Sequence, residues 1–194
     1  VTEELLQSLT HVNFCPHFHL SLQSGCDATL KRMNRKYDTA RYFAAVEAIR
    51  RVFPTAAITT DVIVGFCGET DEEFAETLAF VQKVGFADVH VFPYSPRQGA
   101  VSAKWKDTDP AVKKHRAEVL GELKLQLKER FALANKGSVQ RVLVEEIVDG
   151  KAVGYTPNYL RVYFDADPLT VGTLVDVVVG EPYADGATAT PVQG

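Results

Sequence analysis

Polar residues and glycines follow three stretches of the sequence that are typical of β-strands. These groups are Gln23 to Gly25, Asp61 together with Gly65 to Glu69, and Tyr94 to Arg97. In a parallel α/β sheet ligands bind beyond the carboxyl ends of the strands, and glycine lets a ligand approach the backbone. Each group alone is more typical of a tight strand–helix turn. Three groups at one edge of a sheet predict a site for a bound polar cofactor.

Histidines and paired carboxylates supply other candidate chemistry. His17 and His19 share one face of a predicted strand and could be half of a metal site. No third ligand is nearby in the sequence. We therefore favour a structural role for the two histidines, on the wall of the sheet interior or at satisfied polar positions. His90 lies in mid-strand and is more typical of a core histidine. Glu145-Glu146 could be a carboxylate pair, but a solvated strand end is favoured.

The three cysteines, Cys15, Cys26 and Cys67, are widely spaced and form no C-x-x-C pair. We therefore expect no structural zinc site, no protein-bound metal and no disulfide framework, and a reducing, cytoplasmic location is favoured. The sequence contains no Walker loop, no G-x-G-x-x-G and no Ser/His/Asp order, which disfavours those classes of enzyme.

Composition and charge exclude further classes of protein. The chain has 194 residues, of which 46% are hydrophobic and 24% charged, which is typical of a globular protein. No apolar run is long enough to predict a membrane span, and the first residues do not resemble a signal peptide. The net charge of −4 argues against binding of nucleic acid, DNA in particular, through bulk electrostatics. The chain opens on Val1 in mid-pattern, which predicts a piece of a longer protein.

Charge is unevenly distributed along the chain. From Ser138 onward three basic residues stand against eight acidic ones. A local basic cluster precedes this part and consists of Lys31, Arg32, Arg35, Lys36 and Arg41. Such a cluster is usually a solvated face, but it follows the end of a predicted strand and could bind an anion.

The elements that would position these residues are predicted from hydrophobic periodicity. Strands are expected at 18–23, 57–64 and 88–92, the second of them covered on both faces, and helices at 1–9, 39–51, 70–85 and 109–137. A strand–helix unit repeated three times implies a parallel sheet, either a half barrel or a small open sheet. Short strands at 139–147, 151–155, 160–164, 173–179 and 187–192 then predict a small antiparallel barrel. The fold class is therefore α/β plus all-β, with domains at 1–136 and 137–194.

Four motifs resemble a known family. They are His19-Leu-Ser-Leu-Gln-Ser-Gly25, Leu30-Lys-Arg-Met-Asn-Arg-Lys-Tyr37, Thr60-Asp-Val-Ile-Val-Gly-Phe-x-Gly-Glu-Thr70 and Phe92-Pro-Tyr-Ser-x-Arg-x-Gly99. Together they resemble the tRNA methylthiotransferases, which are radical S-adenosylmethionine (SAM) enzymes. Residues 154–162 resemble the family's TRAM module, a small RNA-binding barrel. The likeness is closest to the branch acting on N6-threonylcarbamoyladenosine, and less close to those acting on isopentenyladenosine or a ribosomal protein.

The resemblance implies a fold, cofactors and partners. It implies part of a radical-SAM, TIM-like barrel followed by a TRAM-like barrel, with SAM and two [4Fe-4S] clusters in the full-length parent. The family's C-x-x-x-C-x-x-C motif is absent from this chain, so the cluster ligands are expected upstream of Val1 and the chain alone is expected to be inactive, with no catalytic residue of its own. The expected partners are tRNA and the missing N-terminal part of the enzyme. An unpaired strand edge at 18–23 would also permit self-association.

The resemblance also implies roles for particular residues. Those expected around SAM are Gln23, Ser24, Asp61, Gly65, Phe66 and the backbone near Tyr94. Those expected to bind the RNA backbone or a substrate carboxylate are Arg32, Arg35 and Arg97, because a guanidinium binds oxyanions bidentately. In the barrel the expected RNA contacts are Arg141, Lys151, Tyr155, Tyr159 and Arg161.

The sequence departs from the family at two further places, and other functions stay open. Cys67 stands where the family usually has proline, and Ala100-Val101-Ser102 where it tends to have Thr-Pro-Ala. An RNA-binding module that binds no SAM, and an α/β scaffold that binds neither ligand, are the alternatives.

Overall fold

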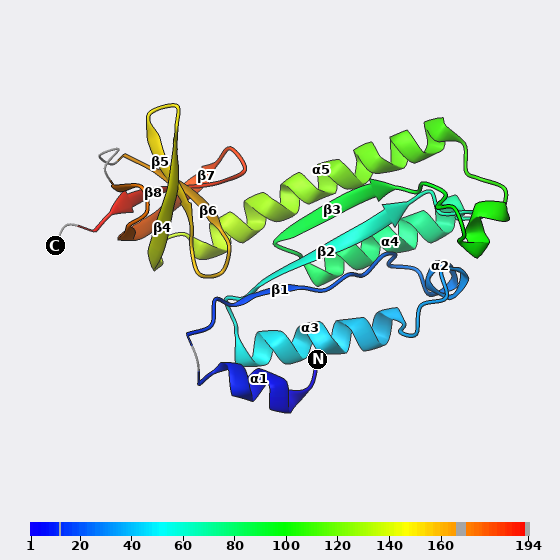
Figure 1. The fold of residues 1–194 in the computed structure, drawn as a ribbon, viewed down its shortest axis with the longest axis horizontal. Helices are drawn as coiled ribbons and strands as arrows, with labels where there is room; N and C mark the ends of the chain where they lie inside the picture. Colours follow the sequence, from blue (N-terminus) through cyan, green and yellow to red (C-terminus); the bar gives the residue numbers. More distant parts are fainter. Residues whose placement is uncertain (12, 166–169, 193–194) are drawn as a thin grey trace. The chain divides into compact units, whose positions relative to one another are not determined.

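The computed structural model describes residues 1–11, 13–165 and 170–192 (Figure 1). By its internal contacts the chain divides into two compact units. The first unit comprises residues 1–18, 49–57 and 128–194, and the second comprises residues 19–48 and 58–127. The barrel strands begin at Val139, but the first unit also takes in the amino-terminal segment, so a boundary at 136–138 stays a prediction.

A three-stranded sheet has the order β1 (His17–His19), β2 (Ala57–Val64), β3 (Asp88–Pro93). Strands β2 and β3 are parallel, with Thr59 opposite Asp88 and Val64 opposite Pro93. The parallel sheet predicted from the strand–helix repeat is therefore confirmed. Regular pairing of β1 is shorter than predicted, because residues beyond it touch β2 only through a bridge from Gln23 to Val62.

The long helices lie where the periodicity predicted them. They are α3 (Thr39–Val52), α4 (Asp71–Val84) and α5 (Pro110–Asn135). Helix α4 begins with the expected capping box between Thr70 and Glu73, and ends at Gly85 in a left-handed conformation with φ of 65°. Three short helices complete this part: α1 (Glu3–Leu9), α2 (Asp27–Arg32) and the 3-10 helix η1 (Val101–Lys104). No described helix is both long and apolar enough to span a bilayer.

The two faces of β2 differ in burial. Thr60, Val62 and Val64 are fully buried, whereas Asp61 and Ile63, which point to the opposite face, are only half-buried. The expectation that β2 is covered on both faces is therefore confirmed for residues 57–60, which are all buried, and is wrong at Asp61 and Ile63. The second face is open to ligands, as a site requires.

Two tyrosines cover part of the outer edge beyond β1. The Tyr42 hydroxyl donates to the Leu20 carbonyl at 2.7 Å, and the Tyr37 hydroxyl lies 2.9 Å from the Ser21 carbonyl and 3.0 Å from that of Leu22. These carbonyls are thus already satisfied within one chain. Self-association through residues 18–23 stays a prediction.

The last part of the chain is a closed barrel with strand order β4-β5-β6-β8-β7. The strands are β4 (Val139–Val148), β5 (Lys151–Tyr155), β6 (Arg161–Phe164), β7 (Leu174–Tyr183) and β8 (Gly186–Pro191). Its core includes Val142, Val144, Val162, Phe164 and Val177, each at most 1% exposed.

The barrel is not wholly antiparallel, which corrects the prediction. Strands β6 and β8 pair in parallel through Val162 opposite Ala187, whereas the other four pairings are antiparallel. The hairpin β7–β8 places β8 beside β6, and this last contact closes the sheet without free edges. Strand periodicity alone does not reveal that the barrel closes through a parallel pair of strands.

Candidate functional site

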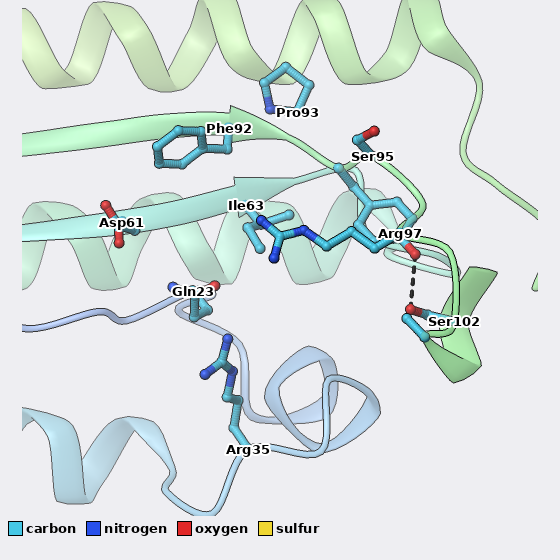
Figure 2. Close-up of a pocket in the computed structure, with 11 residues that line it drawn as sticks. Gln23, Arg35, Asp61, Ile63, Phe92, Pro93, Ser95, Arg97 and Ser102 are labelled. Carbon is cyan, nitrogen blue, oxygen red and sulfur yellow. Dashed lines mark hydrogen bonds between the residues drawn. The ribbon is translucent and has the colours of Figure 1, made fainter.

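A cavity of about 520 Å³ opens where β2 and β3 end (Figure 2). It lies at the carboxyl edge of the sheet, where parallel α/β folds bind ligands. Its lining comprises Gln23, Arg35, Asp61, Ile63, Phe92, Pro93, Tyr94, Ser95, Arg97, Ala100 and Ser102. Five residues predicted from sequence, namely Gln23, Asp61, Tyr94, Arg35 and Arg97, thus meet at one cavity.

Gln23 enters this cavity from a constrained backbone. Its φ is 70°, a left-handed value that is uncommon for a residue with a side chain. Its amide donates to the Asp61 carbonyl at 2.8 Å, and its carbonyl accepts from the Ile63 amide at 2.9 Å. These bonds hold the Gln23 amide side chain, a neutral donor and acceptor, at the edge of the open face.

Asp61 is the centre of a polar row on the open face of the sheet. Its carboxylate lies 3.1 Å from His19 Nε2, accepts from the Ser21 hydroxyl at 3.0 Å, and lies 3.6 Å from His90 Nδ1. The Asp61–His90 pair follows from the register of β2 and β3. Sequence reasoning treated His19 and His90 as wall or core residues, and only the strand register reveals that they flank Asp61.

Two arginines extend into the cavity without an ion-pair partner among the described residues. Arg35 and Arg97 are both exposed, and their guanidinium groups point toward the space around Gln23 and Ile63 (Figure 2). Ile63 and Phe92 supply an apolar wall, Phe92 being 50% exposed. The arrangement therefore suits a flat apolar ligand that carries an anionic group.

Three other predicted cofactor residues do not line the cavity. Ser24 is fully buried, and its hydroxyl lies 3.2 Å from that of Thr77. Phe66 is 5% exposed and packs edge-on against Tyr94, with ring centroids 4.9 Å apart. Gly65 has φ of 70° and faces a lysine of α5 rather than open space. In this conformation these residues support the site without reaching its surface.

Arg32, predicted to hold an anion, pairs with Glu73 instead. One guanidinium nitrogen donates to Glu73 Oε1 at 2.7 Å, and a second donates to Oε2. The Arg32 hydrogen bond lowers the pKa of the Glu73 carboxyl, although burial acts against it. This bidentate pair joins α2 to the capping box of α4, so Arg32 has a structural partner that its sequence position does not reveal.

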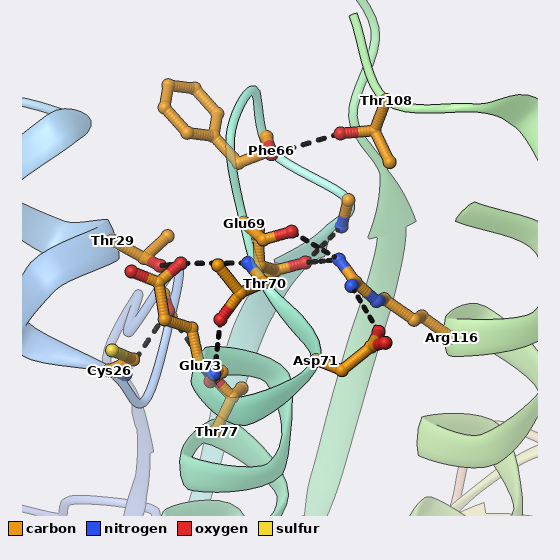
Figure 3. Close-up of polar contacts among 12 residues, drawn as sticks. Cys26, Thr29, Phe66, Glu69, Thr70, Asp71, Glu73, Thr77, Thr108 and Arg116 are labelled. Carbon is orange, nitrogen blue, oxygen red and sulfur yellow. Dashed lines mark hydrogen bonds and ion pairs between the residues drawn. The ribbon is translucent and has the colours of Figure 1, made fainter. Parts of the chain in front are cut away.

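A buried ion pair holds the loop that follows β2 (Figure 3). The Glu69 carboxylate is fully buried, accepts from the Gly65 amide at 2.6 Å, and pairs with Arg116 of α5 at 2.8 Å. Arg116 also donates to the Glu69 carbonyl and to Asp71. Burial raises the pKa of the Glu69 carboxyl, whereas the Gly65 amide and Arg116 act in the opposite direction.

Lys113 of α5 holds the loop that follows β3 in a similar manner. Its ammonium group donates to the Tyr94 carbonyl at 3.0 Å and pairs with Asp107 at 2.7 Å. The Tyr94 amide is occupied by the Val64 carbonyl, so a ligand would meet only the remaining lone pair of the Tyr94 carbonyl. Sequence reasoning missed Lys113 and Arg116. The only signal in the sequence was that both residues carry a charge at positions on the apolar stripe of the 109–137 helix, which indicates buried charges with partners.

In the barrel the predicted cations all have acidic partners. Arg141 pairs with Asp176 at 2.9 Å, and Lys151 with Asp165 at 3.2 Å. Arg161 pairs with Glu146 at 2.8 Å and with Asp185 at 3.0 Å. Tyr159, another predicted RNA contact, carries no charge and is 54% exposed. The barrel therefore presents little uncompensated positive charge for phosphate groups.

Comparison with known proteins identifies the relatives of this fold. Residues 1–81 match the radical SAM superfamily. The threonylcarbamoyladenosine tRNA methylthiotransferase MtaB of Bacillus subtilis (strain 168) is 38% identical over 197 residues, covering 96% of this chain and 44% of that protein. Over nearly its whole length the chain is similar to part of these tRNA methylthiotransferases. The tRNA-2-methylthio-N(6)-dimethylallyladenosine synthase of Thermoanaerobacter sp. (strain X514) is 37% identical, covering 95% of this chain and 40% of that protein.

The chain spans less than half the length of these curated relatives. A solved structure, coproporphyrinogen III oxidase (HemN) from Escherichia coli, matches with a TM-score of 0.55 and 17% identity. The match covers 94% of this chain and 44% of that one. At this identity the likeness shows a radical-SAM type of fold and nothing about substrate.

The described residues fit the two cofactors of the radical SAM superfamily unequally. The cavity, with the Gln23 side chain, the Asp61 carboxylate and the Tyr94 carbonyl, offers the neutral and anionic acceptors that the ammonium and adenine groups of SAM require. For an iron–sulfur cluster the described residues do not fit, since none of their His, Cys, Asp and Glu side chains form a group of three suited to a metal ion. Cys26 and Cys67 are buried, and burial raises the pKa of the Cys26 thiol.

Proposed function

We propose that this chain is the part of a tRNA methylthiotransferase that binds SAM and the modified base, and that the base is N6-threonylcarbamoyladenosine next to the anticodon. The relationship to proteins named as tRNA methylthiotransferases supports the reaction. In this proposal the three-stranded sheet is part of a radical-SAM barrel, and the β4–β8 barrel is a TRAM-like module that contacts tRNA. The enzyme acts in the cytoplasm.

The choice of base rests on the two unpaired arginines of the cavity. The dimethylallyl group carries no charge, whereas the threonylcarbamoyl group ends in a carboxylate. Arg35 and Arg97 offer planar donors that bind a carboxylate bidentately, and Ile63 and Phe92 offer an apolar surface for a purine. Sequence identity favours neither substrate, because the two named relatives differ by one percentage point. The arginines therefore carry the proposal.

The residues of this chain bind and orient rather than react. Bound SAM would supply a 5′-deoxyadenosyl radical, the reagent that radical SAM enzymes use to remove a hydrogen atom. Gln23, Asp61 and Tyr94 would hold the polar groups of SAM. Lys113 and Arg116 would keep the loops after β3 and β2 in place. The two [4Fe-4S] clusters of the proposal would take their ligands from an N-terminal part of the enzyme that is not in this chain.

The experiment uses the enzyme at its natural full length, prepared anaerobically with iron and sulfide. It is incubated with SAM, a reductant and tRNA that bears threonylcarbamoyladenosine, and the digested nucleosides are analysed by mass spectrometry. We expect a methylthio group on that nucleoside and none on dimethylallyladenosine in a parallel reaction. Methylthiolation of dimethylallyladenosine alone would contradict the substrate. SAM cleavage without either product would contradict the reaction.

Variants then test the arginines. Arg35→Ala and Arg97→Ala are expected to raise KM for the threonylcarbamoyl tRNA about 10- to 150-fold each, since a hydrogen bond to a charged group contributes about 1.5–3 kcal/mol. The matched control is Lys36→Ala, a neighbouring exposed cation that bonds Asn34 at 2.8 Å and does not line the cavity. Equal effects of all three changes would indicate general charge attraction and contradict carboxylate recognition.

A further inference from the structure

Three aromatic rings stack in a column within the unit that contains the barrel. The Tyr159 ring lies parallel to the His17 ring, with centroids 4.4 Å apart and planes 7° apart. The Tyr155 ring lies 4.7 Å from Tyr159 at 19°. Nearly parallel rings at this centroid spacing are offset-stacked, which is an arrangement that aromatic side chains favour and that neighbouring bases in nucleic acids also adopt. We call these residues the ring column.

The ring column is displayed at the cost of backbone strain. Tyr159 has φ of 64°, and a bulky residue in the left-handed region is an outlier. Its side chain nevertheless stays 54% exposed, so burial of the ring does not explain the conformation. Residues held in such conformations cost about 1–3 kcal/mol and cluster at functional sites. The left-handed residue ends the turn between β5 and β6, in which the Tyr159 amide donates to the Thr156 carbonyl, and it leaves the Tyr159 side chain on the surface.

A buried hydrogen-bond network fixes the loop that carries Tyr159. The Tyr159 amide donates to the Thr156 carbonyl, and the Thr156 hydroxyl accepts from the Leu160 amide, both at 2.9 Å. The side-chain amide nitrogen (Nδ2) of the buried Asn158 donates to the Thr55 carbonyl and to Asn135 Oδ1, both at 2.8 Å. The loop is thus held from both sides, and Tyr159 is presented in a preorganised position.

Charge around the ring column favours a neutral ligand group over a phosphate. Every cation in residues 138–194 (Arg141, Lys151 and Arg161) pairs with a carboxylate. Burial raises the pKa of the Tyr155 hydroxyl, Arg161 opposes this, and the carboxylates of Asp185 and Glu145 reinforce it. Carboxylates near the column repel a phosphate, but they do not repel the uncharged face of a base.

We infer that the ring column, Tyr155, Tyr159 and His17, is a stacking platform for one unpaired nucleobase of the bound RNA. Because His17 and Tyr155 cover the two faces of the Tyr159 ring, the base stacks on an end of the column. This inference rests on the proposed function, because it names how the enzyme holds tRNA. Stacking of a base on an aromatic side chain is tolerant of sequence, because every base presents an uncharged π-face. It explains how an acidic barrel contacts RNA, and it assigns His17, which precedes the barrel in sequence, to the same contact.

The test measures RNA binding by the enzyme at its natural full length. An anticodon stem–loop carries 2-aminopurine at each unpaired loop position in turn, and its affinity and fluorescence are recorded at several salt concentrations. In the unaltered protein one position is expected to lose fluorescence on binding, because stacking quenches 2-aminopurine. Tyr159→Leu is expected to weaken binding about 5- to 150-fold. The dependence of binding on salt should stay unchanged, because no phosphate contact is removed.

Two further variants separate stacking from folding. Tyr159→Phe keeps the ring and is expected to bind within about twofold of the unaltered protein. Tyr183→Leu removes another exposed ring of the barrel, 45% exposed and packed edge-on against Tyr163, and is the matched control. It is expected to leave RNA binding unchanged. An equal loss in Tyr159→Leu and Tyr183→Leu would indicate general damage to the barrel and overturn the inference.

The outcomes also distinguish the inference from the proposed function. If the unaltered protein binds the stem–loop but no position is quenched, or if Tyr159→Leu binds as tightly, the platform is overturned and the reaction is untouched. If the unaltered protein binds no tRNA, both are overturned. A fully folded Tyr159→Leu variant that transfers methylthio groups with unchanged KM for tRNA would likewise overturn only the platform.

Discussion

Replacing Arg116 by methionine is expected to destabilise the second compact unit in a pH-dependent manner. The substitution removes the cation at 2.8 Å from Glu69, at a place where the Glu69 side chain is 0% and the Arg116 side chain 4% exposed. A carboxyl left there without its partner avoids the buried charge by binding a proton. From its ordinary pKa of 4.5, protonation costs about 3 kcal/mol at pH 7 and less than about 1 kcal/mol at pH 5. The cost at pH 7 agrees with the usual cost of breaking a buried ion pair, about 3–5 kcal/mol.

The sign of the pH dependence follows from proton binding. Burial raises the pKa of Glu69 in the folded state, and loss of Arg116 removes an opposing influence. Between pH 4.5 and 7 the folded variant then binds more protons than the unfolded chain, so its free energy of unfolding falls as the pH rises. The double variant Glu69→Gln with Arg116→Met carries no buried titrating group at this place, because the remaining carboxylate, that of Asp71, is exposed. It is expected to lose the pH dependence and to recover most of the stability.

Urea unfolding at pH 5 and pH 7, followed by fluorescence, measures this effect. Trp105 is the single tryptophan of the chain and lies 6.1 Å from the Phe66 ring, so it reports on the same unit. The control is Arg130→Met, an exposed arginine on the same helix that is expected to change stability by less than about 0.5 kcal/mol. A loss of less than about 1 kcal/mol at pH 7, or an equal loss at both pH values, would refute the reasoning.

Three further changes test other parts of the fold by thermal or urea denaturation. Gly154→Ala is expected to cost about 3 kcal/mol or more, because a Cβ there would lie 2.0 Å from the Leu143 carbonyl oxygen. Gly121→Ala in α5 meets nothing within 4 Å and is expected to stabilise by about 0.5–1 kcal/mol; destabilisation would show that the helix packs differently. Asn158→Ala is expected to cost about 1–3 kcal/mol, because the buried Asn135 Oδ1 and the Thr55 carbonyl lose their donor, and an unchanged melting temperature would contradict that.

The elements of this protein are largely determined by local sequence. Periodicity predicts α3, α4, β2 and β3 to within about one residue of their observed ends, because apolar spacing and capping act over neighbouring residues. The short helices α2 and η1 were not predicted, since six and four residues carry too little periodicity. Strand signals also predicted the five barrel strands, but not the parallel contact between β6 and β8, which depends on how the barrel closes.

The candidate site is likewise predicted in part by the sequence and decided in part by the fold. The positions of Gln23, Asp61, Tyr94, Arg35 and Arg97 at strand ends and in motifs follow from the sequence, because the topology of a parallel sheet brings such ends to one edge. Sequence alone also implies the family, through motifs that keep their spacing along the chain.

Only the tertiary structure decides which charges are free to bind a ligand. Arg32 and Arg35 look alike in the sequence, yet Arg32 is held by Glu73, 41 residues away, while Arg35 reaches the cavity. The barrel cations Arg141 and Arg161 are likewise neutralised by distant carboxylates, and the stacking of Tyr159 on His17 joins residues far apart in the chain. Ion pairs and ring stacks form between side chains that only the fold brings together, so residue type predicts that a group can bind but not whether another group already occupies it.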